Sequence, residues 1–456
     1  MGTDAAANLF QPPGPAIPLG ELSPRRRLAA LRYNALEIWP ARAYEEELLS
    51  QTFFGHKLLL INAPAGIEHV LLTNAANYRR SPAAIRIVRP IVGKGLFLSE
   101  GEDWRLQRRT IAPALSPRVM PMLAQHIVEV GREALTRLEA AKSGPVDLLA
   151  AMQFLALEVA GRSMFSVDMG RHGAEMRRMI VGFVDTLTRP HLLDMFLPAW
   201  IPNLRDVRRR LFRARWTRLM DPIVAERVKQ PTGEARDLFD LLRAVRDPET
   251  GQGFTQSELR DQLSTMIVFG HETTALALFW SLYLLASAPA VQERLAEEVK
   301  DIDFAPATAN EVLPRLTYAR AVVSEALRLF PPAFVMVRNA IARDSFGGFE
   351  IPAGSQVVIA PWLLHRHRKI WANPDAFDPS RFLSDAPPPP RFTYLPFGAG
   401  PRVCVGAQMA MSETMLILSM MIQRFRITRA DSVPVLLLAV VLTRPDHAAP
   451  FRLELR

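Results

Sequence analysis

The only cysteine of this 456-residue chain, Cys404, lies in the segment Phe397-Gly-Ala-Gly-Pro-Arg-Val-Cys-Val-Gly406. A single thiol cannot form an internal disulfide or a Cys-x-x-Cys metal site. It can, however, supply one axial thiolate to the metal of a cofactor. The glycines around it would let the backbone approach a flat ring closely and adopt positive φ. Arg402 places a cation two residues before the sulfur.

The residues that follow Cys404 predict a helix over 407–424, because apolar side chains recur there at near-helical spacing. Cys404 would then lie at a helix N-terminus, where free amide groups and the helix dipole favour an anion. Both effects lower the pKa of a thiol. A buried structural cysteine is the alternative for a lone thiol.

A second informative segment lies on a long predicted helix. Thr255-Gln-Ser-Glu258 is a capping box, and Pro289 stops the helix that it starts. Near the middle lies Phe269-Gly-His-Glu-Thr-Thr274, in which glycine and two threonines are poor helix formers. Threonine hydroxyls can also bond to carbonyls of the previous turn. We therefore expect a local distortion and a groove able to hold dioxygen and water. A satisfied polar cluster in the core is the alternative.

The Cys404 segment resembles the heme-binding loop of the cytochrome P450 family, Phe-x-x-Gly-x-Arg-x-Cys-x-Gly, and every fixed position is matched. The resemblance covers about residues 30–456 and is to the soluble bacterial type. It implies heme b, with Cys404 as the axial ligand of the iron and Phe397 and Arg402 beside the cofactor. The expected fold is mainly α with small β-sheets, a single cytochrome P450 domain over 21–456 after a flexible, proline-rich tail over 1–20.

The segment around Thr273 is similar to the oxygen-activation motif of the same family, Ala/Gly-Gly-x-Asp/Glu-Thr-Thr/Ser. The resemblance implies that the Thr273 hydroxyl hydrogen-bonds dioxygen and that Glu272 relays protons toward it. Splitting dioxygen so that one atom leaves as water requires two protons. Phe269 departs from the pattern, where a small residue is expected, and we expect its ring to narrow the substrate pocket.

Two further groups of residues match the family. Glu325-Ala-Leu-Arg328, on a helix predicted over about 318–330, matches Glu-x-x-Arg, and Arg381 lies in a matching downstream segment. The resemblance implies a buried network of these three residues that braces the cysteine loop. The heme propionates need cations, and arginine pairs carboxylates bidentately. The resemblance assigns this role to Trp104, Arg108, Arg338 and Arg402.

Composition and charge narrow the possible function. The net charge of +9 could indicate nucleic-acid binding. We find no zinc-finger spacing, RNP-like motif or dense basic tail, so a basic docking face for an acidic electron donor is preferred. The N-terminus has neither a signal peptide nor an anchor. The uncharged run over 273–292 reads as a buried helix rather than a transmembrane span, so a cytoplasmic protein is expected.

The region over 334–364 predicts short strands and a hairpin, and residues 435–442 predict another strand. The pocket should be lined by residues 79–97 and 186–202, which are apolar apart from scattered arginines. A small hydrophobic substrate is expected, and the arginines indicate an acidic or amphipathic one.

The resemblance implies a heme-thiolate monooxygenase that inserts one atom of O2 into an apolar organic substrate. Too few residues follow Cys404 for a flavin domain, and no cysteines remain for an iron–sulfur cluster. Electrons should therefore come from a separate ferredoxin or flavodoxin with its NAD(P)H reductase. A peroxide-dependent or rearranging heme-thiolate enzyme and a non-enzymatic heme-binding sensor are the alternatives.

Overall fold

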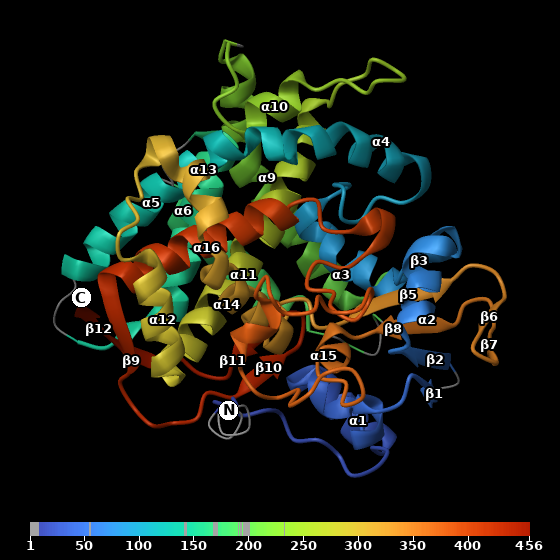
Figure 1. Cartoon of the computed structure of the whole chain (residues 1–456). Coiled ribbons are helices and arrows are strands. Elements are labelled where there is room, and N and C mark those ends of the chain that lie inside the picture. The colour runs from blue at the N-terminus through green and yellow to red at the C-terminus, as the bar shows by residue number, and fades with distance from the viewer. Residues whose placement is uncertain are drawn as a thin grey trace.

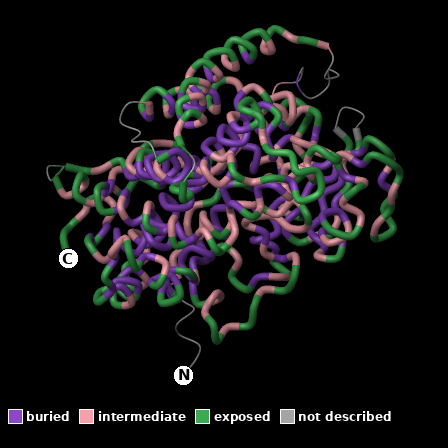
Figure 2. The backbone as a smooth tube through the Cα atoms, turned by 90° about the horizontal axis from the view of Figure 1, so that it is seen from above, coloured by how far each residue is buried: buried purple, intermediate pink, exposed green. Residues whose placement is uncertain are grey.

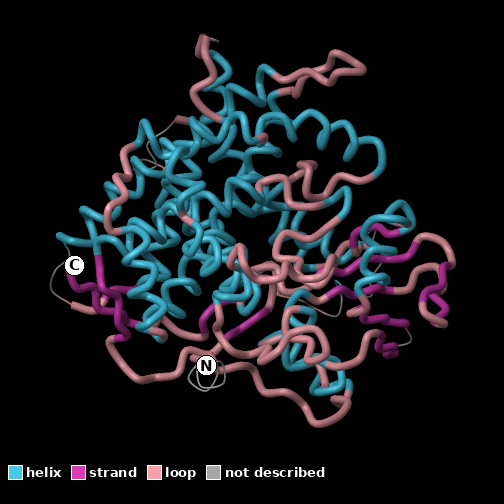
Figure 3. The backbone as a smooth tube through the Cα atoms, in the orientation of Figure 1, coloured by secondary structure: helices cyan, strands magenta, loops and turns pink. Residues whose placement is uncertain are grey.

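A computed structural model describes residues 9–456 except 54–55, 141–143, 167–171, 190, 192–193, 195–200 and 232. Part of the tail predicted over 1–20 and much of the pocket segment predicted over 186–202 therefore lie outside the described residues. The rest forms a mainly helical body with small sheets at its edges, as the sequence predicts (Figure 1, Figure 3).

Helices supply most of the described structure. Their bounds are α1 Pro24–Tyr33, α2 Pro64–Glu68, α3 Pro82–Val92, α4 Gly101–Ile111, α5 Met120–Ala140, α6 Leu148–Phe165, α7 Gly173–Thr186, α9 Leu204–Lys229, α10 Leu238–Ala244, α11 Gln256–Ser287, α12 Pro289–Val299, α13 Ala309–Val312, α14 Thr317–Leu329, α15 Pro361–Leu364 and α16 Ala407–Arg424.

Helix α11 runs through the middle of the molecule and packs against α6, α14 and α16 (Figure 1). The predicted capping box is present: Glu258 N donates to Thr255 Oγ1, and Thr255 N donates to Glu258 Oε2 at 2.8 Å. The predicted distortion is wrong, because α11 is continuously α-helical through Gly270. The Thr273 hydroxyl does donate to the Phe269 carbonyl of the previous turn, and the remaining turns hold the helix regular.

The strands form small sheets. Their bounds are β1 Leu48–Phe53, β2 His56–Ile61, β3 Tyr78–Arg80, β4 Val146–Asp147, β5 Met336–Ala340, β6 Asp344–Phe346, β7 Phe349–Ile351, β8 Gln356–Ile359, β9 Phe425–Arg429, β10 Leu437–Ala439, β11 Thr443–Pro445 and β12 Pro450–Leu455. A five-stranded sheet has the order β1-β2-β8-β5-β3, in which only β2 and β8 are parallel. A three-stranded sheet has the order β4-β12-β9, and two ribbons pair β10 with β11 and β6 with β7.

Two strand predictions have different outcomes. The hairpin at Gly347-Gly348 is present, and both glycines have positive φ, 58° and 79°, between β6 and β7. The strand predicted over 435–442 is shorter, since only Leu437–Ala439 pairs with β11. Alternation of burial is limited to those three residues, because Leu438 is exposed between buried Leu437 and Ala439.

Buried residues concentrate at the centre of the helical body, and exposed ones lie along its rim (Figure 2). Two helices, α6 and α11, are long and apolar enough to cross a membrane by length and composition. Within their most apolar windows, however, 72% and 83% of the residues are buried inside the fold. This burial is typical of core helices, which agrees with the sequence interpretation of residues 273–292.

Candidate heme-thiolate site

The cysteine loop, residues 397–406, is held by its own backbone hydrogen bonds. A short helix, Gly400–Arg402, precedes Cys404, whose amide donates to the Phe397 carbonyl at 2.9 Å. Gly400 has φ of +70°, and a Cβ there would clash with the Leu71 carbonyl oxygen. Only glycine tolerates both the positive φ and the close approach of the Leu71 carbonyl without strain. The loop therefore presents Cys404 just before α16, in agreement with the sequence.

The Cys404 thiol is exposed, yet protein atoms surround it closely enough to desolvate it. Burial raises its pKa above the ordinary value, and the Gly406 amide and the Arg108 guanidinium oppose that rise only in part. The expectation of a lowered pKa is wrong for the chain alone, since desolvation outweighs both favourable contacts. A bound metal ion would reverse the balance, because it deprotonates a coordinating thiol.

One face of α11 differs from the rest of this buried helix. Met266, Phe269, Gly270 and Thr273 are partly exposed, whereas Ile267, Val268 and residues 271–272 are buried. The spacing of three and four residues places the four on one side of the helix. A Cβ on Gly270 would meet only the Met164 methyl, at 3.8 Å. This face has room beside it, and Thr273 lies on it.

Phe269 partly covers this face. Its ring centroid lies 4.0 Å from that of Phe97, which follows α3. The guanidinium carbon of Arg80, at the end of β3, lies 4.1 Å from the Phe97 centroid. The departure from the family pattern thus gives an aromatic pair near Thr273. The sequence predicts that the Phe269 ring narrows the substrate pocket, but it does not predict that Phe97 packs against Phe269.

Glu272 points away from that face and is fully engaged. It is only 1% exposed, accepts from Gln153 of α6 at 3.2 Å, and pairs with Arg444 of β11 at 2.7 Å. Arg444 also bonds to Asp185, a half-exposed carboxylate at the end of α7, at 2.8 Å. A row of charged side chains, Asp185, Arg444 and Glu272, therefore leads from the surface to the residue next to Thr273. These partners lie far away along the chain, so no local pattern in the sequence predicts them.

A group of cations lies beside the loop. Burial and the nearby Arg338 and Arg402 lower the pKa of Arg80 to about 9. Burial and Arg402 likewise lower the pKa of Arg338 to about 10. Glu100 forms an ion pair with Arg402, and Arg80 Nε is buried without a hydrogen-bond partner. Three guanidinium groups against one carboxylate leave a net charge of +2.

The other predicted cofactor residues lie on α4 and the loop. The guanidinium carbon of Arg402 lies 4.7 Å from the centroid of the Trp104 ring, and Arg402 Nη1 donates to the Ser99 carbonyl at 3.0 Å. Arg108 donates to the Val403 carbonyl at 2.9 Å, next to Cys404. The structure thus brings Trp104 to Arg402, whereas Arg108 contacts the cysteine loop.

The predicted contacts among Glu325, Arg328 and Arg381 are present. Arg328 donates twice to Glu325, at 2.6 and 2.8 Å, and both side chains are completely buried. Arg381 Nε lies 3.4 Å from Glu325 Oε1. Arg328 also bonds to the carbonyls of three loop residues, His365, Pro374 and Ala376. The network therefore ties α14 to the segment that leads toward the cysteine loop.

These residues fit a heme. Its two propionates would match the net charge of +2 at Arg80, Arg338, Arg402 and Glu100, and the orphaned Arg80 Nε supplies a free donor. Cys404 would supply the thiolate. A Cβ on Gly406 would meet nothing within 4 Å, so the backbone beside the sulfur is also accessible. The arrangement is that of a heme-thiolate protein.

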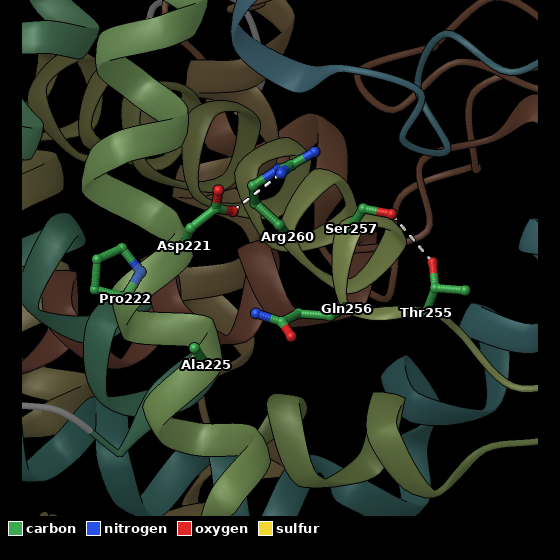
Figure 4. Close-up of a pocket in the computed structure, with 7 residues that line it drawn as sticks. All are labelled: Asp221, Pro222, Ala225, Thr255, Gln256, Ser257 and Arg260. Carbon is green, nitrogen blue, oxygen red and sulfur yellow. Dashed lines mark hydrogen bonds and ion pairs between the residues drawn. The ribbon is translucent and has the colours of Figure 1, made fainter.

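Two cavities are lined by described residues that do not include Cys404. One, of about 600 Å³, lies between α9 and the start of α11, where Arg260 bonds to Asp221 at 2.9 Å (Figure 4). The other, of about 1340 Å³, reaches Arg80 and Glu100 but not Cys404. The polar contacts above, rather than cavity size, therefore define the candidate site.

Comparisons with known proteins agree with this geometry. The family model for cytochrome P450 matches residues 41–448. Cyclooctatin synthase of Streptomyces melanosporofaciens is 34% identical over 365 residues, covering 80% of this chain and 79% of that protein. Cyclooctat-9-en-7-ol 5-monooxygenase of the same organism is 32% identical over 341 residues, covering 74% of each chain.

A solved structure extends the comparison to the whole chain. The heme domain of cytochrome P450DA shares 26% identity, with a TM-score of 0.82 and 98% of both chains covered. The chain belongs to the cytochrome P450 family. It is a heme-thiolate monooxygenase, and its prosthetic group is iron protoporphyrin IX.

Proposed function

We propose that this enzyme inserts one atom of O2 into a small apolar organic substrate in the cytoplasm. Its electrons come from a separate ferredoxin or flavodoxin served by an NAD(P)H reductase. The reaction is RH + O2 + 2e⁻ + 2H⁺ giving ROH + H2O. The observation that carries the proposal is that the fold has both an exposed thiol, Cys404, and a partly exposed face of α11 that carries Thr273. The bound heme supplies the oxidising chemistry.

Thr273 and Glu272 have the roles of holding and delivering protons. The Thr273 hydroxyl donates to the Phe269 carbonyl, so it must rotate away from that carbonyl to donate toward the substrate side. Glu272 exchanges its bond to Arg444 for one directed toward Thr273, and Arg444 then keeps its bond to Asp185 alone. Glu272 and Thr273 are neighbours on α11, so Glu272 can serve Thr273 through water once its side chain has turned from Arg444.

Cys404 is the axial ligand in this proposal, and Phe397, Trp104, Arg108, Arg338 and Arg402 hold the cofactor. Arg108 and Arg402 act where their contacts already lie, at the Val403 carbonyl and at Trp104. Glu325, Arg328 and Arg381 keep the surrounding segments in place. The excess of basic residues, a net charge of +9, favours docking of an acidic electron donor.

An apolar substrate is favoured by two observations. The names of the two Streptomyces relatives describe a cyclooctatin synthase and an oxygenase of an unsaturated alcohol. In this chain, Phe97 and Phe269 form an aromatic wall near Thr273. Such a wall favours hydrocarbon over polar groups.

A peroxide-dependent or rearranging reaction is the second candidate, and Phe269 is the observation that favours it. A ring beside Thr273 occupies space that dioxygen and water would share. The alternative predicts turnover with hydrogen peroxide that needs neither an electron donor nor the Thr273 hydroxyl.

The test is the coupling of NADPH oxidation to product in Thr273→Ala, with Thr273→Ser as the matched control that keeps the hydroxyl. The assay combines the enzyme with a ferredoxin, its reductase and a compound that shifts the ferric Soret band. The alanine variant should keep consuming NADPH, while the share of electrons recovered as hydrogen peroxide rises about tenfold. Unchanged coupling in the alanine variant would refute the role of Thr273.

A further inference from the structure

The larger cavity, about 1340 Å³, opens between α3, α9, the start of α11 and the edge formed by β3 and β5. We call it the basic cleft. Figure 1 shows α3 and β3 side by side, with α9 extending above α3, and α3 packs against both α9 and α11. The cleft adjoins the candidate heme site, because Arg80 and Glu100 are among the residues that line it.

The charge of the basic cleft is strongly unbalanced. Nine cationic and four acidic residues line it, so their formal charges sum to +5. All four acidic residues are already bound. Asp206 pairs with Arg86 and Arg209, and Asp261 pairs with Arg213 at 2.6 Å. Glu100 pairs with Arg402, and Glu258 caps α11.

Four of the nine cations have no partner among the described residues. Arg79 on β3, Arg89 on α3, Lys94 after α3 and Arg210 on α9 are all exposed and line the cleft. None of them forms a side-chain hydrogen bond, ion pair or ring contact within the described part of the chain. Four cations from separate elements thus line one cavity, and no carboxylate of the described residues pairs with any of them.

The same cleft also has apolar surface. Pro82, Ile85 and Ile341 contribute hydrocarbon to its lining. Arg80, one of the lining residues, stacks on Phe97, which in turn packs against Phe269. A ligand with a charged head and an apolar body could therefore contact both kinds of surface at once.

We propose that the basic cleft binds the anionic group of the substrate, a carboxylate or a phosphate, while the apolar body extends past Phe97 and Phe269 toward Thr273. This inference rests on the proposed monooxygenase function and narrows its substrate class to amphipathic organic anions. Guanidinium and ammonium groups suit such anions because they donate charge-assisted hydrogen bonds. The concave shape of the site favours a small molecule over a flat membrane surface.

The test is isothermal titration calorimetry on the heme-loaded protein with dodecanoate, dodecyl phosphate and dodecan-1-ol, each below its micelle concentration. Dodecanoate or dodecyl phosphate should bind at least about tenfold more tightly than the alcohol, and that advantage should shrink as salt is raised. Comparison of the two anions distinguishes a carboxylate from a phosphate site. Arg89→Gln/Arg210→Gln should weaken binding of the preferred anion about tenfold and leave dodecan-1-ol within twofold.

Arg208→Gln is the matched control, because Arg208 is exposed on the same helix as Arg210 but does not line the cleft. It should leave all three affinities unchanged. The inference is overturned if the alcohol binds as tightly as both anions, or if the double variant loses nothing. Binding of the wild-type protein to phosphatidylglycerol vesicles that the double variant alone loses would also overturn it, in favour of a membrane surface. A normal carbon monoxide spectrum in the same samples separates these failures from failure of the heme function.

Discussion

Replacing Glu325 with glutamine should cost more stability than any surface charge substitution, because it strands a buried cation. Arg328 is completely buried and donates five hydrogen bonds, two of them to Glu325. Glu325 also accepts from the Asp378 amide at 2.9 Å. Glutamine keeps one acceptor oxygen but turns an NH2 group toward the Arg328 donors. Removing one partner of a buried pair costs about 3–5 kcal/mol.

The assay is urea unfolding of the heme-loaded protein, followed by far-UV circular dichroism and by the Soret band. Glu350→Gln is the matched control, because its partner Arg343 lies 2.6 Å away and both side chains are more than half exposed. Glu350→Gln should lower the free energy of unfolding by at most about 0.5 kcal/mol. Arg381→Gln should fall between the two, since Arg381 lies at the rim of the network.

A Glu325→Gln variant that loses less than about 1 kcal/mol would refute the view that this network is held by a buried charge pair. If the variant yields no folded protein, the Arg381→Gln measurement still decides the matter. Equal costs for Arg381→Gln and Glu350→Gln would contradict the account.

Two other substitutions test separate parts of the structure. Phe269→Ala removes the ring that packs on Phe97, so the Soret shift should show about tenfold tighter binding of bulky azoles, while Phe154→Ala on the exposed side of α6 should change nothing. Burial disfavours the charged form of Asp344 and by itself raises its pKa. Hydrogen bonds from Tyr78 and His69 outweigh this effect and lower the pKa from 3.8 to about 2. This carboxylate should therefore add on the order of 2 kcal/mol above pH ~4 and lose it as the pH falls toward 2. Urea unfolding across that pH range should show that Asp344→Asn lacks this pH-dependent part of the free energy of unfolding. The same pH dependence in the variant and the wild-type protein would contradict this.

Local sequence signals gave the elements that carry the site. The capping box at Thr255 and the stop at Pro289 define α11 nearly to the residue. The glycine-rich segment predicted a tight loop before α16, and Gly400 needs its positive φ and its missing Cβ. These features depend on neighbours in the chain, so sequence alone can reveal them.

Contacts between distant segments were the part that sequence could not supply. Glu272 is bound by Gln153 and Arg444, which come from other elements. The Cys404 pKa is raised because desolvation by surrounding segments exceeds the local helix effect. The sequence predicts only that the segment 79–97, which contains Arg80, lines the pocket. Alternation along β3 would also predict that Arg79 and Arg80 face opposite sides.

The central claim is that the Cys404 sulfur is the axial ligand of the heme iron. The most direct measurement is the carbon monoxide difference spectrum of the dithionite-reduced protein, with Cys404→Ser as the variant. The wild-type protein should show the red-shifted band typical of thiolate-ligated heme, and the serine variant should lose it while keeping its circular dichroism spectrum. A wild-type protein without that band, or a serine variant that retains it, would contradict the account.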